Sequence, residues 1–136
     1  MGACLAITGA TFIFPVLSYL SPRKATKGNN VLLGIDGHPV PVADLSRAPF
    51  VVGVGVDSEA TIVVRYGGEL RAFSAVCTHL GCLVKWDPAA AEFICPCHGG
   101  KFNADGVNTF GPPPRPLKQF RPSTTPDGFI GLQEVA

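Results

Sequence analysis

The chain has 136 residues, of which 46% are hydrophobic and 15% are charged, and its formal net charge is +1. This length allows one compact domain, and the apolar composition excludes a disordered chain. The balanced charge, without a basic patch interleaved with aromatic residues, excludes nucleic acid as a partner.

The N-terminal segment, residues 1–22, has no charged side chain before Arg23. About 20 helical residues, each rising about 1.5 Å, span the hydrocarbon core of a bilayer. We therefore expect a retained single-pass transmembrane helix in contact with membrane lipid, kinked at Pro15. The alternative is a cleavable secretory signal, which opens with basic residues and ends at a small-residue cleavage site. Neither pattern is evident.

Residues 23–30 are polar, contain Gly28 and lack a hydrophobic period, which predicts a linker. It is either a plain connection or a tether that lets the following domain swing. Its basic residues Arg23, Lys24 and Lys27 bear on topology. Taken alone, the positive-inside rule would place the following domain in the cytoplasm.

From residue 31 to residue 136, short β-rich runs alternate with glycine and proline, which predicts an all-β domain over 31–136. No segment of this region has a sustained helical period or an internal repeat. Paired glycines accept positive φ, so residues 66–69 (YGGE) predict a tight hairpin. The expected strands lie within residues 31–35, 50–56, 60–66, 69–76, 91–95 and 128–133.

Four of the five cysteines and two of the three histidines fall in two boxes, residues 77–82 (CTHLGC) and 95–100 (CPCHGG). The first offers Cys77 and His79, and the second offers Cys95 and His98. One thiolate and one imidazole from each box suit a [2Fe–2S] cluster in which two cysteines hold one iron and two histidines the other. Neutral imidazoles raise the reduction potential and allow electron uptake to be coupled to proton uptake.

A structural Cys₂His₂ zinc site needs the same four donors. Zinc boxes usually pair C-x2-4-C with H-x3-5-H, whereas each box here mixes cysteine with histidine. Zinc also leaves Cys82 and Cys97 without a role. The pattern therefore favours the iron–sulfur cluster.

Cys82 and Cys97 remain once the four ligands are assigned. If both boxes fold over one cluster, these sulfurs are natural disulfide partners, and the alternative is two free buried thiols in a cytosolic carrier. A disulfide indicates an oxidising compartment. We therefore expect the β domain on the extracytoplasmic side, periplasmic or lumenal. Cys4 is expected to be an ordinary small apolar residue of the N-terminal segment.

The two boxes and residues 111–117 (GPPPRPL) resemble the two cluster loops and the proline-rich loop of the Rieske iron–sulfur subunit of cytochrome bc1 and b6f complexes. The resemblance extends over the anchor, the linker and the β domain. It implies an antiparallel β-sandwich with a cluster-binding subdomain. The residue roles that it implies are Cys77 and Cys95 on an inner iron, His79 and His98 on an outer iron near the surface, and a bridge between Cys82 and Cys97.

The resemblance also implies a function, an electron-transfer subunit of a quinol:cytochrome c or plastocyanin oxidoreductase without independent catalysis. By position, His98 corresponds to the ligand that meets quinol in the pocket of a cytochrome b subunit. Leu80 and Pro113 would form part of an apolar docking tip. His98 would take the proton as the cluster takes the electron, and the electron would pass to a c-type haem protein of the cytochrome c1 or f kind.

Two positions depart from the family pattern. Many members have Ser and Tyr where this chain has Gly100 and Phe102, and their hydroxyls donate hydrogen bonds to the cluster sulfurs. Such bonds stabilise the reduced, more negative cluster, so their loss lowers the potential. We expect a potential in the lower or middle part of the range of roughly −150 to +300 mV, suited to a low-potential quinol such as menaquinol.

Two other classes carry similar boxes. One is the Rieske small subunit of another exported oxidoreductase, such as arsenite oxidase, but residues 111–117 and the long uncharged anchor favour the quinol-oxidising complex. The other is a soluble Rieske ferredoxin or a dioxygenase domain, which generally lacks the extra cysteine pair. Among the other residues, His38 is expected in an exposed turn, and Trp86 is expected in the core near the first box. Gly99 and Gly106 are expected where the backbone needs a close approach or positive φ.

Overall fold

The computed structural model describes residues 30–135. The expected anchor at residues 1–22 and the linker up to residue 29 lie outside the described residues. Within residues 30–135, no helix has the length and apolar character needed to cross a membrane.

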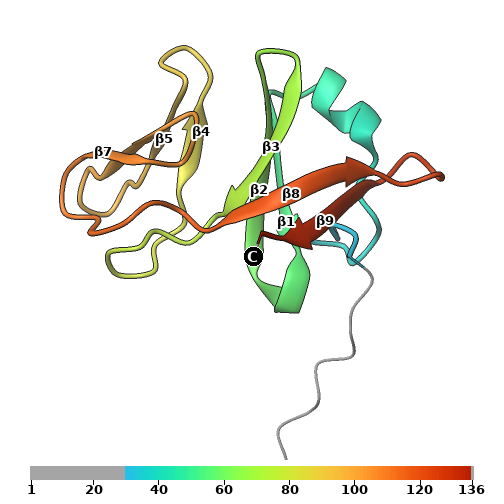
Figure 1. The fold of residues 1–136 in the computed structure, drawn as a ribbon, viewed down its shortest axis with the longest axis horizontal. Helices are drawn as coiled ribbons and strands as arrows, with labels where there is room; N and C mark the ends of the chain where they lie inside the picture. Colours follow the sequence, from blue (N-terminus) through green and yellow to red (C-terminus); the bar gives the residue numbers. More distant parts are fainter. Residues whose placement is uncertain (1–29, 136) are drawn as a thin grey trace, which may run out of the picture.

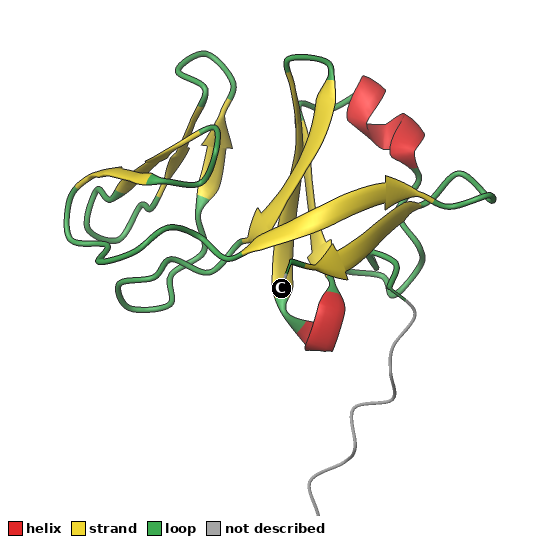
Figure 2. Cartoon of the chain, viewed as in Figure 1, coloured by secondary structure: helices red, strands yellow, loops and turns green. Residues whose placement is uncertain are grey.

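Two antiparallel sheets build the domain (Figures 1 and 2), and the all-β prediction is confirmed. The larger sheet has the order β1-β2-β3-β8-β9, with β1 (Phe50–Val54), β2 (Ala60–Tyr66), β3 (Glu69–Ser74), β8 (Gln119–Thr124) and β9 (Ile130–Glu134). The smaller sheet has the order β4-β5-β6-β7, with β4 (Lys85–Asp87), β5 (Glu92–Ile94), β6 (Lys101–Asn103) and β7 (Asn108–Phe110). Two short 3₁₀ helices, η1 (Val42–Ser46) and η2 (Val56–Ser58), flank β1.

Successive side chains of a strand point to opposite sides of the sheet. Because the central strand β2 has consecutive apolar residues, the centre of the larger sheet is apolar on both faces. In β2, Ile62 and Val64 enter one core, and Val63 enters the other. The β2–β3 turn follows the prediction: Tyr66 pairs with Glu69, and Gly67 and Gly68 have φ of 62° and 84°. Both glycines supply the positive φ that a two-residue hairpin turn requires.

Some expected strands are wrong, and some strands were not expected. Residues 31–35 form only isolated bridges, among them Leu33 with Val54 and with Pro39. The sequence of β8 is polar and contains Pro122, which is unfavourable inside a sheet. The strand forms because β3 pairs only with Gln119 and Phe120. Beyond Phe120, β8 pairs with β9 alone, so Pro122 lies in an edge segment with a partner on one side only. The three-residue strands β4, β6 and β7 are too short for a period to show.

One hydrophobic core contains side chains from both sheets and joins them. Phe73 of β3 meets Phe93 of β5 edge to face, with 5.2 Å between ring centroids. Trp86 is buried in the same core, as predicted. At the surface of this joint, Arg71 of β3 donates to the carbonyl of Ala104 at 3.1 Å and pairs with the carboxylate of Asp105. The small sheet is therefore fixed to the large one by packing and by a charged contact.

The topology gathers three loops at one end of the small sheet. Because the strands are antiparallel, the start of β4, the end of β5, the start of β6 and the end of β7 lie at the same edge. The first loop (residues 77–82) leads into β4, the second loop (residues 95–100) joins β5 to β6, and the proline loop (residues 111–117) leaves β7. The three loops, which carry all of the expected ligands, thus lie at one end of the small sheet (Figure 1).

Candidate metal centre

The first and second loops close in the same way. In the first, the N–H of Cys77 donates to the carbonyl of Cys82 at 2.7 Å, and the N–H of Gly81 donates to the carbonyl of Cys77 at 3.1 Å. In the second, Cys95 donates to Gly100 at 2.8 Å and Gly99 donates to Cys95 at 3.1 Å. The fifth residue of each loop is a glycine with positive φ, 77° at Gly81 and 67° at Gly99. Two matching six-residue turns therefore present their side chains to a common space.

The four expected ligands are graded by depth. Cys77 and Cys95 are 3% and 2% exposed, His79 is half-buried, and His98 is exposed. The two imidazole rings lie edge to face with 5.0 Å between their centroids. The cysteines thus form the inner part of the site, and the histidines form its outer part.

Cys82 and Cys97 form a disulfide that joins the two loops, with a Cα–Cα distance of 6.5 Å. The sulfur of Cys95 lies within 4.8 Å of both disulfide sulfurs. Because the disulfide sulfurs are bonded to each other, they are not thiolates and do not belong to the ligand set. The disulfide predicted from the sequence is present, and it lies directly against one of the expected ligands.

The remaining donors fit a mixed cysteine and histidine cluster. Cys77 and Cys95 are the free cysteines of the described residues, and neither imidazole hydrogen-bonds to a group within residues 30–135. Burial raises the pKa of the Cys77 thiol, and the neighbouring Cys95 thiol raises it further, while N–H groups of His79 and Leu80 directed at the sulfur act in the opposite sense. A cation that the two sulfurs share would favour the thiolates and offset this burial.

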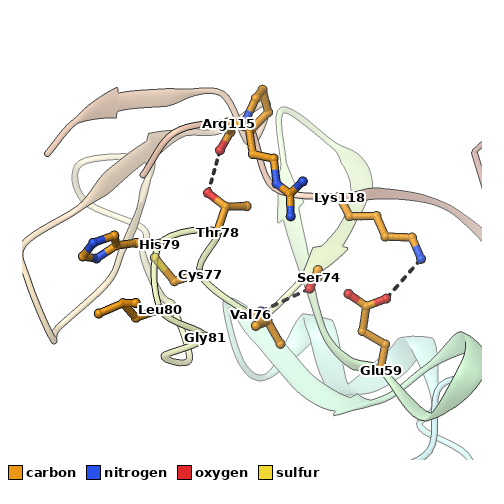
Figure 3. A pocket seen from close by; sticks show the side chains of 11 residues that line it. Glu59, Ser74, Val76, Cys77, Thr78, His79, Leu80, Gly81, Arg115 and Lys118 are labelled. Atoms are coloured by element: carbon orange, nitrogen blue, oxygen red, sulfur yellow. Dashed lines mark hydrogen bonds and ion pairs between the residues drawn. The ribbon is translucent and has the colours of Figure 1, made fainter. Parts of the chain in front are cut away.

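The first loop is tied to the proline loop by a side chain. The hydroxyl of Thr78 donates to the carbonyl of Arg115 at 2.7 Å. Figure 3 shows this bond next to His79 and Leu80, which project from the same loop. Leu80, which the family resemblance assigns to the docking tip, is 70% exposed. Sequence reasoning missed the role of Thr78, because its partner is a backbone carbonyl 37 residues away.

The second loop is tied to the proline loop by close backbone packing. A Cβ placed on Gly100 would lie 2.6 Å from Cγ of Pro113, and a Cβ on Gly111 would lie 2.9 Å from Cα of Gly100. The carbonyl of Pro113 also accepts a hydrogen bond from the side chain of Asn108 at 3.1 Å. These contacts bury Pro113. The apolar docking tip expected at Leu80 and Pro113 stays a prediction, and the Pro113 ring fills the space that a side chain at position 100 would occupy.

Other sequence predictions about single residues are confirmed. His38 is exposed in a turn, where its N–H donates to the carboxylate of Asp36 at 3.1 Å. Gly106 has a φ of 75°, and a Cβ there would lie 2.7 Å from the ring of Phe73. The burial of the two positions expected to tune the potential was not predicted: Phe102 is fully buried in the core beneath the loops, and Gly100 is buried under Pro113.

A pair of thiols and a pair of imidazoles, presented by matching loops at one end of an antiparallel β domain, define an iron–sulfur electron carrier. The chain belongs to the Rieske [2Fe-2S] domain family, whose model matches residues 39–121. The cofactor of this family is the [2Fe–2S] cluster.

Curated relatives and solved structures extend this assignment. The chain is 38% identical over 123 residues to the cytochrome b6-f complex iron-sulfur subunit of Chlorobaculum tepidum, covering 89% of this chain and 64% of that protein. It is 37% identical to the subunit of the same name from Gloeobacter violaceus, covering 95% of this chain and 76% of that one. The crystal structure of the plasma membrane Rieske protein of Synechocystis superposes with a TM-score of 0.62 at 32% identity, covering 69% of this chain and 95% of that chain. The chain thus spans less than two thirds of the length of the Chlorobaculum tepidum relative.

Proposed function

We propose that this chain is the electron-transfer subunit of a membrane-bound, quinol-oxidising complex of the cytochrome bc type, an oxidoreductase. The similarity to two cytochrome b6-f iron-sulfur subunits carries this proposal. The match to the Gloeobacter violaceus subunit covers 95% of this chain, so it extends beyond residues 30–135 into the N-terminal segment. A subunit related over this length fits attachment to the same kind of complex. No observation favours the arsenite oxidase alternative.

We assign the four ligands by depth. Cys77 and Cys95 would hold the inner iron, and His79 and His98 would hold the outer one. When bound, the cluster supplies one-electron transfer at a positive or mildly negative potential. His98 is the exposed ligand, so it is the group that can meet quinol and hold a proton at its outer ring nitrogen. Leu80 provides apolar surface next to His79 for an apolar pocket of a cytochrome b subunit.

The disulfide supports an extracytoplasmic position for the domain. Structural disulfides persist in oxidising compartments, whereas cytosolic reductants keep thiols reduced. Cys82 is half-buried and Cys97 is exposed, so a reductant could reach the bond. The periplasm or a lumen is therefore the compartment that suits this domain.

Gly100 and Phe102 support a low-potential centre that would be suited to menaquinol. Neither side chain donates a hydrogen bond to a cluster sulfur. The structure changes how this hypothesis is tested, because a serine at position 100 would collide with Pro113 at 2.6 Å. Phe102→Tyr should therefore be made first, since it adds a hydroxyl to a ring without changing the loop backbone.

An EPR-monitored redox titration tests this hypothesis. We expect Phe102→Tyr to raise the midpoint potential by some tens of millivolts, within the range of roughly −150 to +300 mV that Rieske centres cover. The matched control is Phe120→Tyr, an equally buried phenylalanine in the second core, on the other face of the larger sheet. Equal potentials in Phe102→Tyr and the parent protein would count against tuning by this position.

EPR spectroscopy of membranes with added quinone analogues tests the proposed function itself. We expect a Rieske spectrum whose lines shift as the quinone site is filled, and co-purification of a b-type haem protein. A Rieske spectrum that is insensitive to quinone, with no b-type haem, would exclude the quinol-oxidising complex. A colourless, EPR-silent protein that contains zinc would exclude the cluster as well.

A further inference from the structure

The cavity beside the first loop contains a positive charge that no carboxylate of residues 30–135 neutralises. This cavity has a volume of about 610 Å³, and Thr78, His79, Arg115, Lys118 and Glu59 are among the residues that line it. Within residues 30–135, the guanidinium of Arg115 forms no ion pair and no hydrogen bond. Figure 3 shows this side chain entering the cavity.

The other charges around the cavity offset one another. Lys118 lies 3.1 Å from a carboxylate oxygen of Glu59 and 2.9 Å from one of Glu134. In Figure 3 the ammonium of Lys118 is turned toward Glu59. Apart from Arg115, Lys118 is the only lysine or arginine of the cavity wall, and Glu59 is its only carboxylate, so both are already paired. The guanidinium of Arg115 is therefore the charge that remains available to a binding partner.

The backbone that carries Arg115 is held in place. Its carbonyl accepts the hydrogen bond of Thr78 at 2.7 Å, and Pro114 and Pro116 restrict the backbone on both sides. Thr78 is the immediate neighbour of the ligand His79. A guanidinium on a fixed backbone loses less entropy on binding, and its planar fork matches a carboxylate with two parallel hydrogen bonds.

We infer that the Arg115 cavity receives a carboxylate side chain of the protein that accepts the electron from this domain. This inference rests on the proposed function, since it names how that partner is recognised. Quinol is uncharged and therefore forms no ion pair with the guanidinium. A protein acceptor must be bound and released in every turnover, and an exposed charge contact supplies orientation and speed of encounter at modest affinity.

The first experiment follows electron delivery in membranes that contain the complete complex. In Arg115→Gln, we expect reduction of the acceptor haem after a quinol pulse to slow by about threefold to tenfold at low ionic strength, and its salt dependence to weaken. The matched control is Arg65→Gln, because Arg65 is another exposed arginine without an ion pair among residues 30–135, and it lies at the far end of β2. The midpoint potential and the EPR line shape should stay those of the parent protein, which shows that the cluster and fold are intact.

The second experiment identifies the partner group without measuring electron transfer. In Arg115→Lys, the introduced ammonium can be joined to a touching carboxylate by a water-soluble carbodiimide, which takes up the water released as the amide forms. We expect a cross-linked peptide from the acceptor haem protein that contains Asp or Glu. Arg65→Lys should yield no such peptide.

The outcomes separate this inference from the proposed function. Equal haem reduction in Arg115→Gln and Arg65→Gln would overturn the inference. It would also be overturned by a cross-link to the quinol-binding subunit or to a haem propionate. If the parent membranes lack a quinone-sensitive Rieske spectrum, the proposed function fails first, and the inference fails with it.

Discussion

The first and second loops share a fold but differ in how the proline loop supports them. Both close with the same two backbone hydrogen bonds around a ligand cysteine. The first is tied to the proline loop by the hydroxyl of Thr78, whereas the second packs its bare backbone at Gly100 against Gly111 and Pro113. A cavity lies beside the first loop, whereas the close packing of the second loop leaves no space for a side chain at position 100.

This difference separates two tasks at the two sides of the site. The second loop carries the exposed His98, and its backbone at Gly100 packs closely against the proline loop. The first loop carries the half-buried His79 beside a charged cavity. Under the proposed function, the second side would present the exposed His98 to quinol, and the first side would receive the acceptor protein.

Removal of the disulfide should have the largest effect, because it is the covalent link between the compared loops. The pair of changes Cys82→Ser and Cys97→Ser opens a link between residues 15 apart. We expect a loss of about 3 kcal/mol in the free energy of unfolding, measured by urea denaturation of the purified protein. Cys4→Ser serves as the control because it leaves both loops unchanged. Equal denaturation midpoints in the double variant and the control would contradict the prediction.

Gly111→Ala should break the close packing of the second loop. Gly111 has a φ of 84°, and the new Cβ would lie 2.9 Å from Cα of Gly100. We expect a loss of about 2 to 3 kcal/mol, the sum of backbone strain and overpacking. Gly128→Ala is a matched control, since its φ is 82° and nothing lies within 4 Å of the added Cβ. Gly128→Ala should therefore lose only the part due to backbone strain at positive φ, about 1 kcal/mol of the free energy of unfolding. Equal losses in both variants would show that the contact with Gly100 contributes nothing.

Thr78→Val should loosen the first loop by a smaller amount. The substitution removes one hydrogen bond of 2.7 Å to the carbonyl of Arg115 and keeps the side-chain volume. We expect a loss of about 1 kcal/mol in thermal unfolding, the usual net value of such a bond. Thr109→Val removes a longer bond of 3.3 Å and should cost less. A larger loss in Thr109→Val than in Thr78→Val would refute the special role of Thr78.

Lys118→Met should have the smallest effect, and it should depend on pH. Ion pairs with Glu134 and Glu59 raise the pKa of Lys118 above its usual value. A group whose pKa is raised on folding contributes stability below its unfolded pKa of about 10.4, and loses that contribution as the pH rises through the folded pKa. Because the side chain is 43% exposed, solvent screening limits the contribution to about 0.5 kcal/mol.

Thermal unfolding at pH 8 and above pH 11 measures this dependence. The difference between the parent protein and Lys118→Met should be present at pH 8 and vanish at the higher pH. Lys85→Met, at an exposed lysine without an ion pair among the described residues, should show no such change. A difference in Lys118→Met that persists above pH 11 would assign the stability to the alkyl chain instead.

Local sequence predicted strands β1, β2, β3, β5 and β9, but not the polar strand β8 or the three-residue strands β4, β6 and β7. In β2 the β-branched run at residues 61–64 is followed by the Gly67-Gly68 turn, so its pairing with β3 was visible in the sequence. The strands of the small sheet are three residues long, and their positions depend on the core shared with Phe73. In β8, Pro122 argues against a strand, and only the register with β3 explains its position.

The identity of the site was determined by sequence alone, because ligand chemistry depends on residue type and spacing. The boxes with Cys77, His79, Cys95 and His98 indicate the Rieske family, and the leftover pair Cys82 and Cys97 indicates the disulfide.

Only the tertiary structure decided how the proline loop serves each side of the site. Pro113 is buried against Gly100 and not exposed, and Arg115 is the cation without a carboxylate in the cavity. These facts depend on contacts between segments far apart in the chain, such as Thr78 with Arg115 across 37 residues. The spacing of cysteine and histidine in the sequence predicts the chemistry of the ligands. Which residues are buried and which charges lack a partner depends on how distant segments pack in the folded chain.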